Sequence, residues 1–270
     1  ISKISPDIVF HMAAQSLVIK SYEDPKDTVY SNVIGTYNIL DLINKSDNTK
    51  SLIIATTDKV YRYPEKENKE EAELGGSDFY SATKSSAELL ISAFKNSSKN
   101  DNLNISVVRS GNVIGGGDRS ENRLMTDLIT ALNNDKNFNL RMPESIRPWQ
   151  YILDSLHGYL LIAQENFEDE KSDIYNLNSK INNDYNSQKI AELMFKNWGT
   201  KNEITFQTEI KYKEVDKLTI DSSKAIKKLN WMPKYSVEET VEEIVQWEKY
   251  HKIKKGFDYS LNQIKKFIEK

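Results

Sequence analysis

Short apolar runs alternate with longer segments of helical periodicity along the first two thirds of the chain. Three of these runs, at 7–13, 51–57 and 105–111, are apolar on both faces, which is typical of strands in a parallel sheet that is covered on both sides. A fourth run, DIYNLNS at 173–179, also has strand length. Helical patterns lie between them, at 27–46, 79–98 and 152–166. This βαβ alternation predicts an α/β fold with an open, doubly wound parallel sheet.

The second half of the chain has a different pattern. Amphipathic helices are expected at 123–135, 186–199 and 236–252, together with a short helix within 222–235 that Pro233 stops. These segments predict a smaller, mostly helical domain whose elements are interleaved with the last elements of the sheet. We expect the sheet domain to comprise 1–112 with 147–180, and the second domain 113–146 with 181–270. The polar stretch RYPEKENKEEAE at 62–73 is interpreted as a solvated loop.

Composition limits the kinds of partner. The 270 residues are 38% hydrophobic and 29% charged, with a formal net charge of −3, and charges of both signs alternate along most segments. Without a basic stripe, neither nucleic acid nor a membrane surface is an expected partner. There is no cysteine, and the three histidines (His11, His157, His251) do not have metal-ligand spacing, so no metal site is expected. A reducing, cytoplasmic setting fits these features.

Polar residues follow two of the predicted strands. TTDK at 56–59 and GNVIGGGD at 111–118 lie at carboxyl ends, where ligands bind in sheets of this kind. Asp58 and Lys59 are adjacent, and neighbours on a strand point to opposite faces, so a salt bridge explains the pair poorly. No helix directly follows the glycines of GNVIGGGD, as a phosphate-binding loop would require. That stretch is therefore interpreted as a flexible loop on the substrate side.

Tyr80 and Lys84 are four residues apart near the start of a predicted helix, so they share one face. A lysine ammonium beside a tyrosine stabilises the phenolate and lowers the pKa of the tyrosine toward the value that a general base for an alcohol needs. The Tyr-x-x-x-Lys spacing alone is weak, because any lysine-rich helix contains it. A hydroxyl at Thr57 completes a set suited to removing a proton while a nicotinamide takes a hydride.

TTDK followed by YSATK resembles the catalytic set of the extended short-chain dehydrogenase/reductases. Further stretches narrow the resemblance to their nucleotide-sugar dehydratase branch, and within it to the CDP-glucose 4,6-dehydratases. These stretches are HMAAQSLVIKSYEDP (11–25), NVIGTYNIL (32–40), LGGSDFYSATKSSAE (74–88), RSGNVIGGGD (109–118), RPWQYILDSLHGYLL (147–161) and LTIDSSKAIKKLNWMPKYSVEETV (218–241). Most dehydratases have Glu where this chain has Lys59, and lysine there is similar to the CDP-glucose enzymes.

The resemblance implies a Rossmann-type fold, NAD as cofactor and CDP-glucose as substrate. The implied catalytic residues are Tyr80 as base for the C4 hydroxyl, helped by Thr57 and Lys84, with Asp58 as acid and Lys59 as C5 base. The implied cofactor contacts are His11, Ala13, Ala14, Gln15, Asn32, Thr56, Tyr80 and Lys84; the implied substrate contacts are Asn112, Arg123 and Arg147. By itself, a histidine in the position of His11 is more often a satisfied histidine at a strand end than a ligand contact. Analogy with the family also implies a homodimer or homotetramer, paired through the helices at 27–46 and 79–98.

Two other functions stay open. One is a different extended reductase, an epimerase or decarboxylase, which would lack the Asp58 and Lys59 pair. The other is a non-catalytic remnant that binds nucleotide sugars, because no glycine-rich turn precedes the apolar run at 7–13. We expect on the order of 60 to 80 residues of strand and helix to be missing ahead of that run. The sheet would then lack its first strands, and the chain by itself would bind NAD negligibly, be inactive and associate through an unpaired edge.

Overall fold

The computed structural model describes residues 4–46, 48–98, 100–179, 185–207 and 215–270. The chain divides into two compact units. The first unit comprises Ile1–Gly111, His157–Leu177 and Thr219–Trp231, and the second comprises Asn112–Leu156, Asn178–Leu218 and Met232–Lys270. This division differs from the expected boundaries: 112, 147–156 and 178–180 belong to the second unit, and 219–231 belongs to the first. Trp149 packs in the core of the second unit, whereas Trp231 is fully buried in a core of the first.

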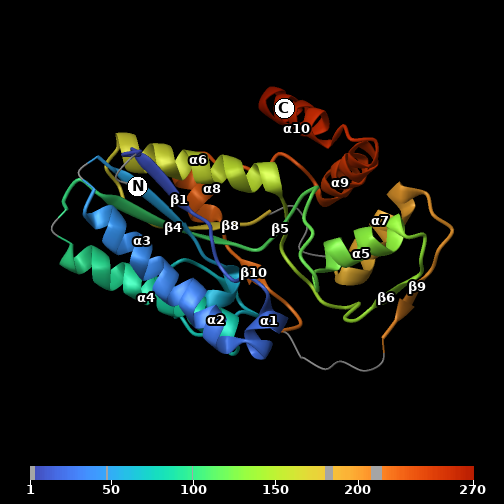
Figure 1. Cartoon of the computed structure of the whole chain (residues 1–270), viewed down its shortest axis with the longest axis horizontal. Helices are drawn as coiled ribbons and strands as arrows, with labels where there is room; N and C mark the ends of the chain where they lie inside the picture. The colour runs from blue at the N-terminus through green and yellow to red at the C-terminus, as the bar shows by residue number, and fades with distance from the viewer. Residues whose placement is uncertain (1–3, 47, 99, 180–184, 208–214) are drawn as a thin grey trace. The chain divides into compact units, whose positions relative to one another are not determined.

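The first unit is built on a four-stranded parallel sheet in the order β1-β2-β4-β8 (Figure 1). Its strands are β1 (Ile8–His11), β2 (Ser51–Ala55), β4 (Asn104–Ser110) and β8 (Ile174–Leu177). Three of them lie within the runs that the hydrophobic pattern predicted, β4 begins one residue before its run, and the α/β class with a parallel sheet is confirmed. Strand β1 stands at one end of this order, and its Ile8 and Phe10 are 37% and 39% exposed.

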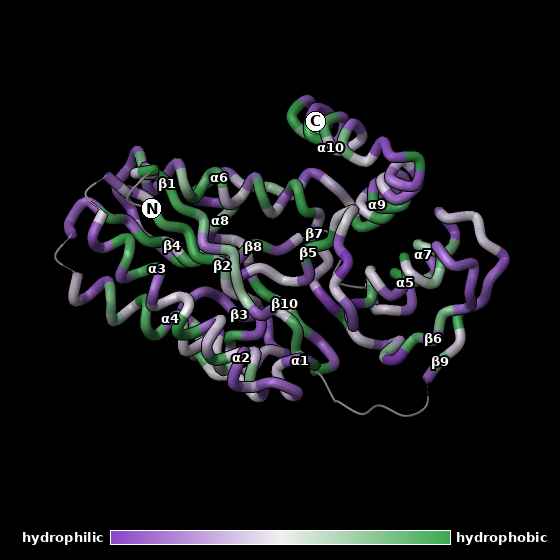
Figure 2. The backbone as a smooth tube through the Cα atoms, in the orientation of Figure 1, coloured by the Kyte–Doolittle hydropathy of each residue, from purple (hydrophilic) through white to green (hydrophobic). Residues whose placement is uncertain are grey.

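Helices cover both faces of this sheet (Figure 1). On one face, α3 (Gly35–Asn44) and α4 (Phe79–Ser97) bury Leu40, Ile43 and Ile91 against β2 and β4. On the other, α6 (Ile152–Glu168) and α8 (Ser223–Leu229) pack against the same strands and β8. The two-sided burial explains why β2 is an unbroken apolar run, and Figure 2 shows the same hydrophobic colouring along the sheet strands.

The predicted helix at 27–46 is a succession of α2 (Pro25–Val29), a π-helical turn η1 (Tyr30–Ile34) and α3, preceded by the short α1 (Val18–Glu23). Asp24 caps α2 through a hydrogen bond from the backbone N–H of Asp27, and Pro25 occupies the first turn, where its missing N–H costs nothing. The π-helical turn contains the buried Asn32. Such turns are rare and are frequent at functional sites.

The interpretation of 62–73 as a solvated loop is wrong for its central part. Strand β3 (Glu67–Asn68) pairs in parallel with β10 (Thr219–Ile220), and Asn68 and Glu70 are both buried. The Glu70 side chain accepts a hydrogen bond from the backbone N–H of Asn176 in β8 (2.8 Å). The acidic composition suggested solvent, but partners far away in the sequence satisfy these polar groups.

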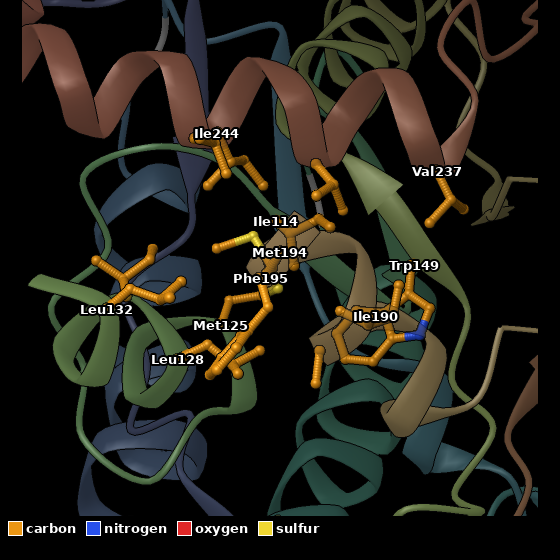
Figure 3. Close-up of a cluster of buried hydrophobic side chains, with 14 of the residues drawn as sticks. Ile114, Met125, Leu128, Leu132, Trp149, Ile190, Met194, Phe195, Val237 and Ile244 are labelled. Carbon is orange, nitrogen blue, oxygen red and sulfur yellow. The ribbon is translucent and has the colours of Figure 1, made fainter. Parts of the chain in front are cut away.

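The second unit packs helices around one hydrophobic core (Figure 3). Its helices are α5 (Leu124–Asn133), α7 (Ser187–Trp198), α9 (Val237–Lys252) and α10 (Gly256–Glu269); its two parallel ribbons are β5 (Asn112–Ile114) with β7 (Trp149–Tyr151) and β6 (Phe138–Leu140) with β9 (Ile204–Phe206). The amphipathic patterns predicted α5, α7 and α9, whereas α10 and the short ribbons were not predicted. Ser236 and Glu239 form a capping box at the start of α9, which fixes where that helix begins.

The glycine segment after β5 is packed, not the flexible loop that the sequence suggested. A β-carbon on Gly116 would lie 2.3 Å from the Trp247 ring of α9, so the backbone approaches that ring too closely for any other residue. Gly117 has a φ of +89°, a left-handed conformation that favours glycine. Among the described residues, no helix combines the length and apolar character needed to cross a membrane.

Candidate active site

Helix α4 carries the tyrosine and the lysine of the YSATK motif in its first two turns. Asp78 caps this helix, and its carboxylate accepts hydrogen bonds from the Ser81 backbone N–H (2.9 Å) and hydroxyl (2.6 Å). These two hydrogen bonds fix the residue at which α4 begins. Tyr80 and Lys84 are 8% and 7% exposed, so the structure buries the pair that the four-residue spacing placed on one face.

Lys84 reaches the end of the neighbouring strand. Its ammonium donates a hydrogen bond to the backbone carbonyl of Ala55, the last residue of β2 (3.0 Å). Burial lowers the pKa of Lys84 to about 8, and the negative charge of Glu88 acts in the opposite direction. The lysine is therefore held at the strand end, and its ammonium loses its proton at a lower pH than that of an ordinary lysine.

Thr57, Asp58 and Lys59 follow β2, but the Asp58–Lys59 pair is not on a strand. Asp58 and Lys59 begin the 3-10 turn η2 (Asp58–Val60), and Thr57 is its N-cap. The Thr57 hydroxyl donates a hydrogen bond to the Asp58 carboxylate (3.0 Å) and accepts a longer one from the Lys59 backbone N–H (3.4 Å). Asp58 is 2% exposed and Lys59 is half-buried. The orientations of the Asp58 and Lys59 side chains are therefore determined by a local turn and not by the alternation of side chains along a strand.

The residues expected on the cofactor side form one network at the end of β1. The Asn32 amide accepts from the Gln15 backbone N–H (2.8 Å) and donates to the Gln15 carbonyl (3.0 Å) and to Thr83 of α4 (3.0 Å). The Gln15 amide donates to Thr28 (2.9 Å). The network ties the chain after β1 to η1 and α4, so both amides support the site from within the fold.

His11, Ala13 and Ala14 lie at the same strand end. His11 is buried, with its ring 3.3 Å from the Thr36 hydroxyl, and burial together with the nearby Lys84 charge lowers the pKa of His11. A neutral imidazole at this position adds no positive charge beside the lysine. Ala13 is exposed and Ala14 is half-buried, which leaves the backbone after β1 open to a ligand.

The sequence did not predict the buried ion pair between Glu88 and Arg109, which contacts Thr56. The Thr56 hydroxyl donates to Glu88 of α4 (2.6 Å), and Glu88 is bound by the guanidinium of Arg109 in β4. Two weak sequence signals were present: Glu88 stands four residues after Lys84 on the same helix face, and Arg109 interrupts the apolar run ISVVRSG. Neither signal identifies its partner.

The three residues expected to contact substrate lie in the second unit. Asn112 begins β5, Arg123 is the N-cap residue of α5, and Arg147 precedes β7. Arg123 pairs with Asp118 (3.2 Å), and its side chain is 38% exposed. Arg147 is buried, and its guanidinium donates to the backbone carbonyls of Ile146 and Asp216. Their roles toward a ligand stay predictions.

The hydrogen-bond donors of Lys84 at the carboxyl end of β2 suit the binding of a nicotinamide dinucleotide. Lys84 has three ammonium N–H groups, and only one of them makes a hydrogen bond to a described residue, which leaves donors for ribose hydroxyls. The buried Tyr80 lies one turn before it on the same helix. Within the part of the chain that the structure describes, no group of three or more histidine, aspartate or glutamate side chains could hold a metal ion.

Comparison with known proteins identifies the family. The model of the family described as GDP-mannose 4,6 dehydratase matches residues 1–244. This chain belongs to the GDP-mannose 4,6 dehydratase family. A curated member of similar sequence is the CDP-glucose 4,6-dehydratase of Salmonella typhimurium, 37% identical over 262 residues, which are 92% of this chain and 72% of that protein. The expected membership among the nucleotide-sugar dehydratases and epimerases is confirmed.

Solved structures agree on the fold. The UDP-glucose 4-epimerase of Thermotoga maritima, determined with UDP-glucose, has a TM-score of 0.80 at 24% identity and covers 91% of this chain and 78% of its own. The dTDP-glucose 4,6-dehydratase of Bacillus anthracis, determined in complex with NAD, has a TM-score of 0.74 at 24% identity and covers 93% and 74%. The Rossmann-type fold predicted from the sequence is confirmed.

Replacing Lys84 separates a catalytic from a structural role. Because the folded-state pKa is below the ordinary 10.5, burying the ammonium costs stability below pH 8, and that cost disappears between about pH 8 and 10.5. For Lys84→Met we expect an unfolding free energy at pH 7 that is unchanged or higher by up to about 3 kcal/mol, with activity at least ~100-fold lower.

Chemical denaturation at pH 7 and pH 10 measures the first effect, and steady-state assays of the full-length protein measure the second. Lys95→Met is the matched control, because Lys95 lies on the same helix, donates to the carbonyl of Ile105 (3.2 Å) and also has a pKa lowered by burial. It should keep full activity. A large stability loss in Lys84→Met with activity retained would make Lys84 a structural residue.

Proposed function

We propose that this protein is an NAD-dependent 4,6-dehydratase of a nucleotide sugar, with CDP-glucose as substrate. The observation that carries the proposal is the succession Thr57, Asp58 and Lys59 at the end of β2, in the same unit as the buried Tyr80 and Lys84. An oxidoreductase acting on an alcohol needs only a hydroxyl, tyrosine and lysine. A carboxyl and an amine next to that set add an acid and a base for the loss of water.

The first step is proton removal from the C4 hydroxyl of the sugar. Tyr80 accepts that proton as a phenolate, which the Lys84 ammonium stabilises, while Thr57 hydrogen-bonds the same hydroxyl. Bound NAD would supply the acceptor for the C4 hydride and, after reduction, the donor of that hydride to C6, with no net change of the cofactor. The proposed contacts of the cofactor are His11, Ala13, Ala14, Gln15, Asn32, Thr56, Tyr80 and Lys84.

The second step is loss of water across C5 and C6. The C4 ketone acidifies the C5 hydrogen, which Lys59, as a neutral amine, removes as a proton. Asp58, as a carboxylic acid, protonates the C6 hydroxyl, the C6–O bond breaks and water leaves. When the hydride returns to C6, Lys59 gives its proton back to C5, Tyr80 releases to solvent the proton that it took from the C4 hydroxyl, and Asp58 takes up one proton from solvent. The sum of these transfers is the loss of one water molecule and the formation of a 4-keto-6-deoxy sugar.

The choice of CDP-glucose rests on two features. The Salmonella typhimurium relative, which bears that activity in its name, is 37% identical, and Lys59 occupies a position where glutamate is usual in dehydratases with other nucleotides. Asn112, Arg123 and Arg147 are the proposed contacts of the sugar and the diphosphate, since a guanidinium fork suits diphosphate oxygens. A dimeric or tetrameric assembly and action in the cytoplasm belong to the same proposal.

The experiment supplies the full-length protein with NAD and, in separate reactions, CDP-glucose, dTDP-glucose, UDP-glucose and GDP-mannose. Mass spectrometry should detect loss of one water from CDP-glucose, with kcat/KM at least ~10-fold above that for the other sugars. A product of unchanged mass with an inverted C4 hydroxyl would instead identify an epimerase. Binding of nucleotide sugars without any turnover would identify a binding protein.

A further inference from the structure

The buried ion pair of the first unit joins helix α4, which carries Tyr80 and Lys84, to strand β4 and to the end of strand β2. Glu88 of α4 and Arg109 of β4 each have side chains that are 2% exposed. The Arg109 Nε donates to both carboxylate oxygens of Glu88 at 3.0 Å, and Nη2 donates to the Oε2 atom. The pair is thus bidentate and fully removed from solvent.

Glu88 also binds the end of strand β2. Its Oε1 atom accepts a hydrogen bond from the hydroxyl of Thr56 (2.6 Å). One helical turn earlier, Lys84 donates to the carbonyl of Ala55 (3.0 Å). Helix α4 is therefore attached to consecutive residues of one strand end, and the next residue along the chain is Thr57. These two attachments hold the residues just before Thr57 against the helix that carries Tyr80.

The other half of the guanidinium is fixed as firmly. Arg109 Nη1 donates to the Tyr61 hydroxyl (2.9 Å) and to the Glu70 carbonyl (2.9 Å). The Tyr61 hydroxyl donates in turn to the Asn176 side chain (2.6 Å), and burial raises the pKa of Tyr61 to about 12, so it stays a neutral phenol. Arg109 therefore cannot follow Glu88 if that side chain moves.

A stabilising role explains this arrangement poorly. When an ion pair is buried, the free energy lost by removing both charges from water is about as large as the free energy gained from their attraction. Replacing the whole pair with apolar residues therefore often leaves the stability of a protein unchanged or raises it. The pair does have an electrostatic effect on the site. Glu88 on the same helix acts on the charge of Lys84, and that charge in turn acts on His11 of β1. Tyr80 lies on the same helix, and Asp58 and Lys59 lie on η2, which packs against α4. Glu88 supplies the negative charge that favours the ammonium.

We propose that Glu88 is a positioning residue for the candidate active site: held by Arg109, its carboxylate fixes Thr56 at the end of β2 and keeps Lys84 protonated. This inference rests on the proposed function for its catalytic consequence. The electrostatic effect of Glu88 concerns only the protonation of Lys84, and the titration of Lys84 can be measured without turnover of a substrate.

The test uses two variants of the full-length protein. In Glu88→Gln/Arg109→Met both charges are removed together, so no unpaired buried charge remains, and the Gln oxygen can still accept from Thr56. In Thr56→Val the ion pair stays and only the hydroxyl link is lost. The matched controls are Glu73→Gln/Arg62→Met, which removes an exposed pair in the same unit, and Thr240→Val, which removes a buried hydroxyl in the second unit.

NMR titration of isotope-labelled lysine side chains, with Lys84 assigned through Lys84→Met, follows the proton on Lys84 directly. The double variant should titrate at least half a pH unit below the parent, and the alkaline limit of kcat should move down with it. Thr56→Val should lower kcat about 10-fold with KM and the pH profile unchanged. The controls should match the parent in all three quantities.

Three outcomes would overturn the inference: an unchanged Lys84 titration in the double variant, unchanged kcat in Thr56→Val, or equal effects in the exposed-pair control. If the double variant does not fold, Thr56→Val still decides whether the hydroxyl link positions the site. A parent protein that converts no nucleotide sugar would refute the proposed function, while the Lys84 titration would still judge the electrostatic role of Glu88.

Discussion

Replacing Tyr80 with phenylalanine is expected to lower kcat by roughly 10²–10⁴-fold while the affinity for nucleotide sugar stays within about twofold. The phenol of Tyr80 is the proposed acceptor of the C4 proton, and its removal leaves the ring in a buried site that is 8% exposed. Only an interaction made in the transition state is lost, so binding of the ground state is preserved. Single-turnover reduction of bound NAD, followed by absorbance, and calorimetric titration with the nucleotide sugar measure the two quantities.

Tyr151→Phe is the matched control, because Tyr151 is equally buried and belongs to an aromatic cluster of the second unit with Tyr235 and Phe267. The control should keep the kcat of the parent. If Tyr80→Phe lost affinity more than tenfold and kcat little, Tyr80 would be a binding contact and the proton acceptor would have to be sought elsewhere.

Replacing Lys59 with alanine is expected to separate the two halves of the reaction. In the proposed mechanism, oxidation at C4 depends on Tyr80, Thr57 and Lys84, which the substitution leaves in place, whereas removal of the C5 proton loses its base. Formation of the 4-keto-6-deoxy product should fall by roughly 10²–10⁴-fold. In deuterated water, exchange of the C5 hydrogen should disappear, while single-turnover reduction of NAD persists.

Lys59→Glu sharpens the test, because a carboxylate can serve as the base and is the residue usual in related dehydratases. We expect it to restore part of the exchange that Lys59→Ala loses. Lys66→Ala, a change at an exposed lysine of the same unit, should have no effect. C5 exchange at the parental rate in Lys59→Ala would show that another group removes the proton.

Much of the sheet was predictable because the covered strands leave an unambiguous pattern. Leu52, Ile53 and Ile54 of β2 are at most 1% exposed, and only a strand with helices on both faces buries consecutive residues in this way. Helix starts were predictable for an equally local reason. Asp78 and Ser236 cap α4 and α9 through backbone groups within three residues, so the signal lies inside one short segment.

The candidate site was predictable where its residues are neighbours in the sequence. Tyr80 and Lys84 share a face because of the helical repeat, and Thr57 stands at a strand end because the apolar run stops there. The geometry of Asp58 and Lys59 was not predictable. The short turn η2, capped by the Thr57 hydroxyl, orients them, and the sequence pattern did not distinguish it from continued strand.

The amino-acid sequence by itself determined the parallel α/β class, the main helices, the tyrosine, lysine and threonine set and the family, because each depends on periodicity or on motifs within a short stretch of chain. Only the tertiary structure decided that Glu88 pairs with Arg109 across 21 residues and that Glu70 is buried against Asn176 across 106. The polar composition of 62–73 assigned Glu70 to solvent, and the pattern around Glu88 and Arg109 did not indicate that they pair. The fold buries them because partners from distant strands satisfy their hydrogen bonds, and no local pattern encodes which distant partner will be near.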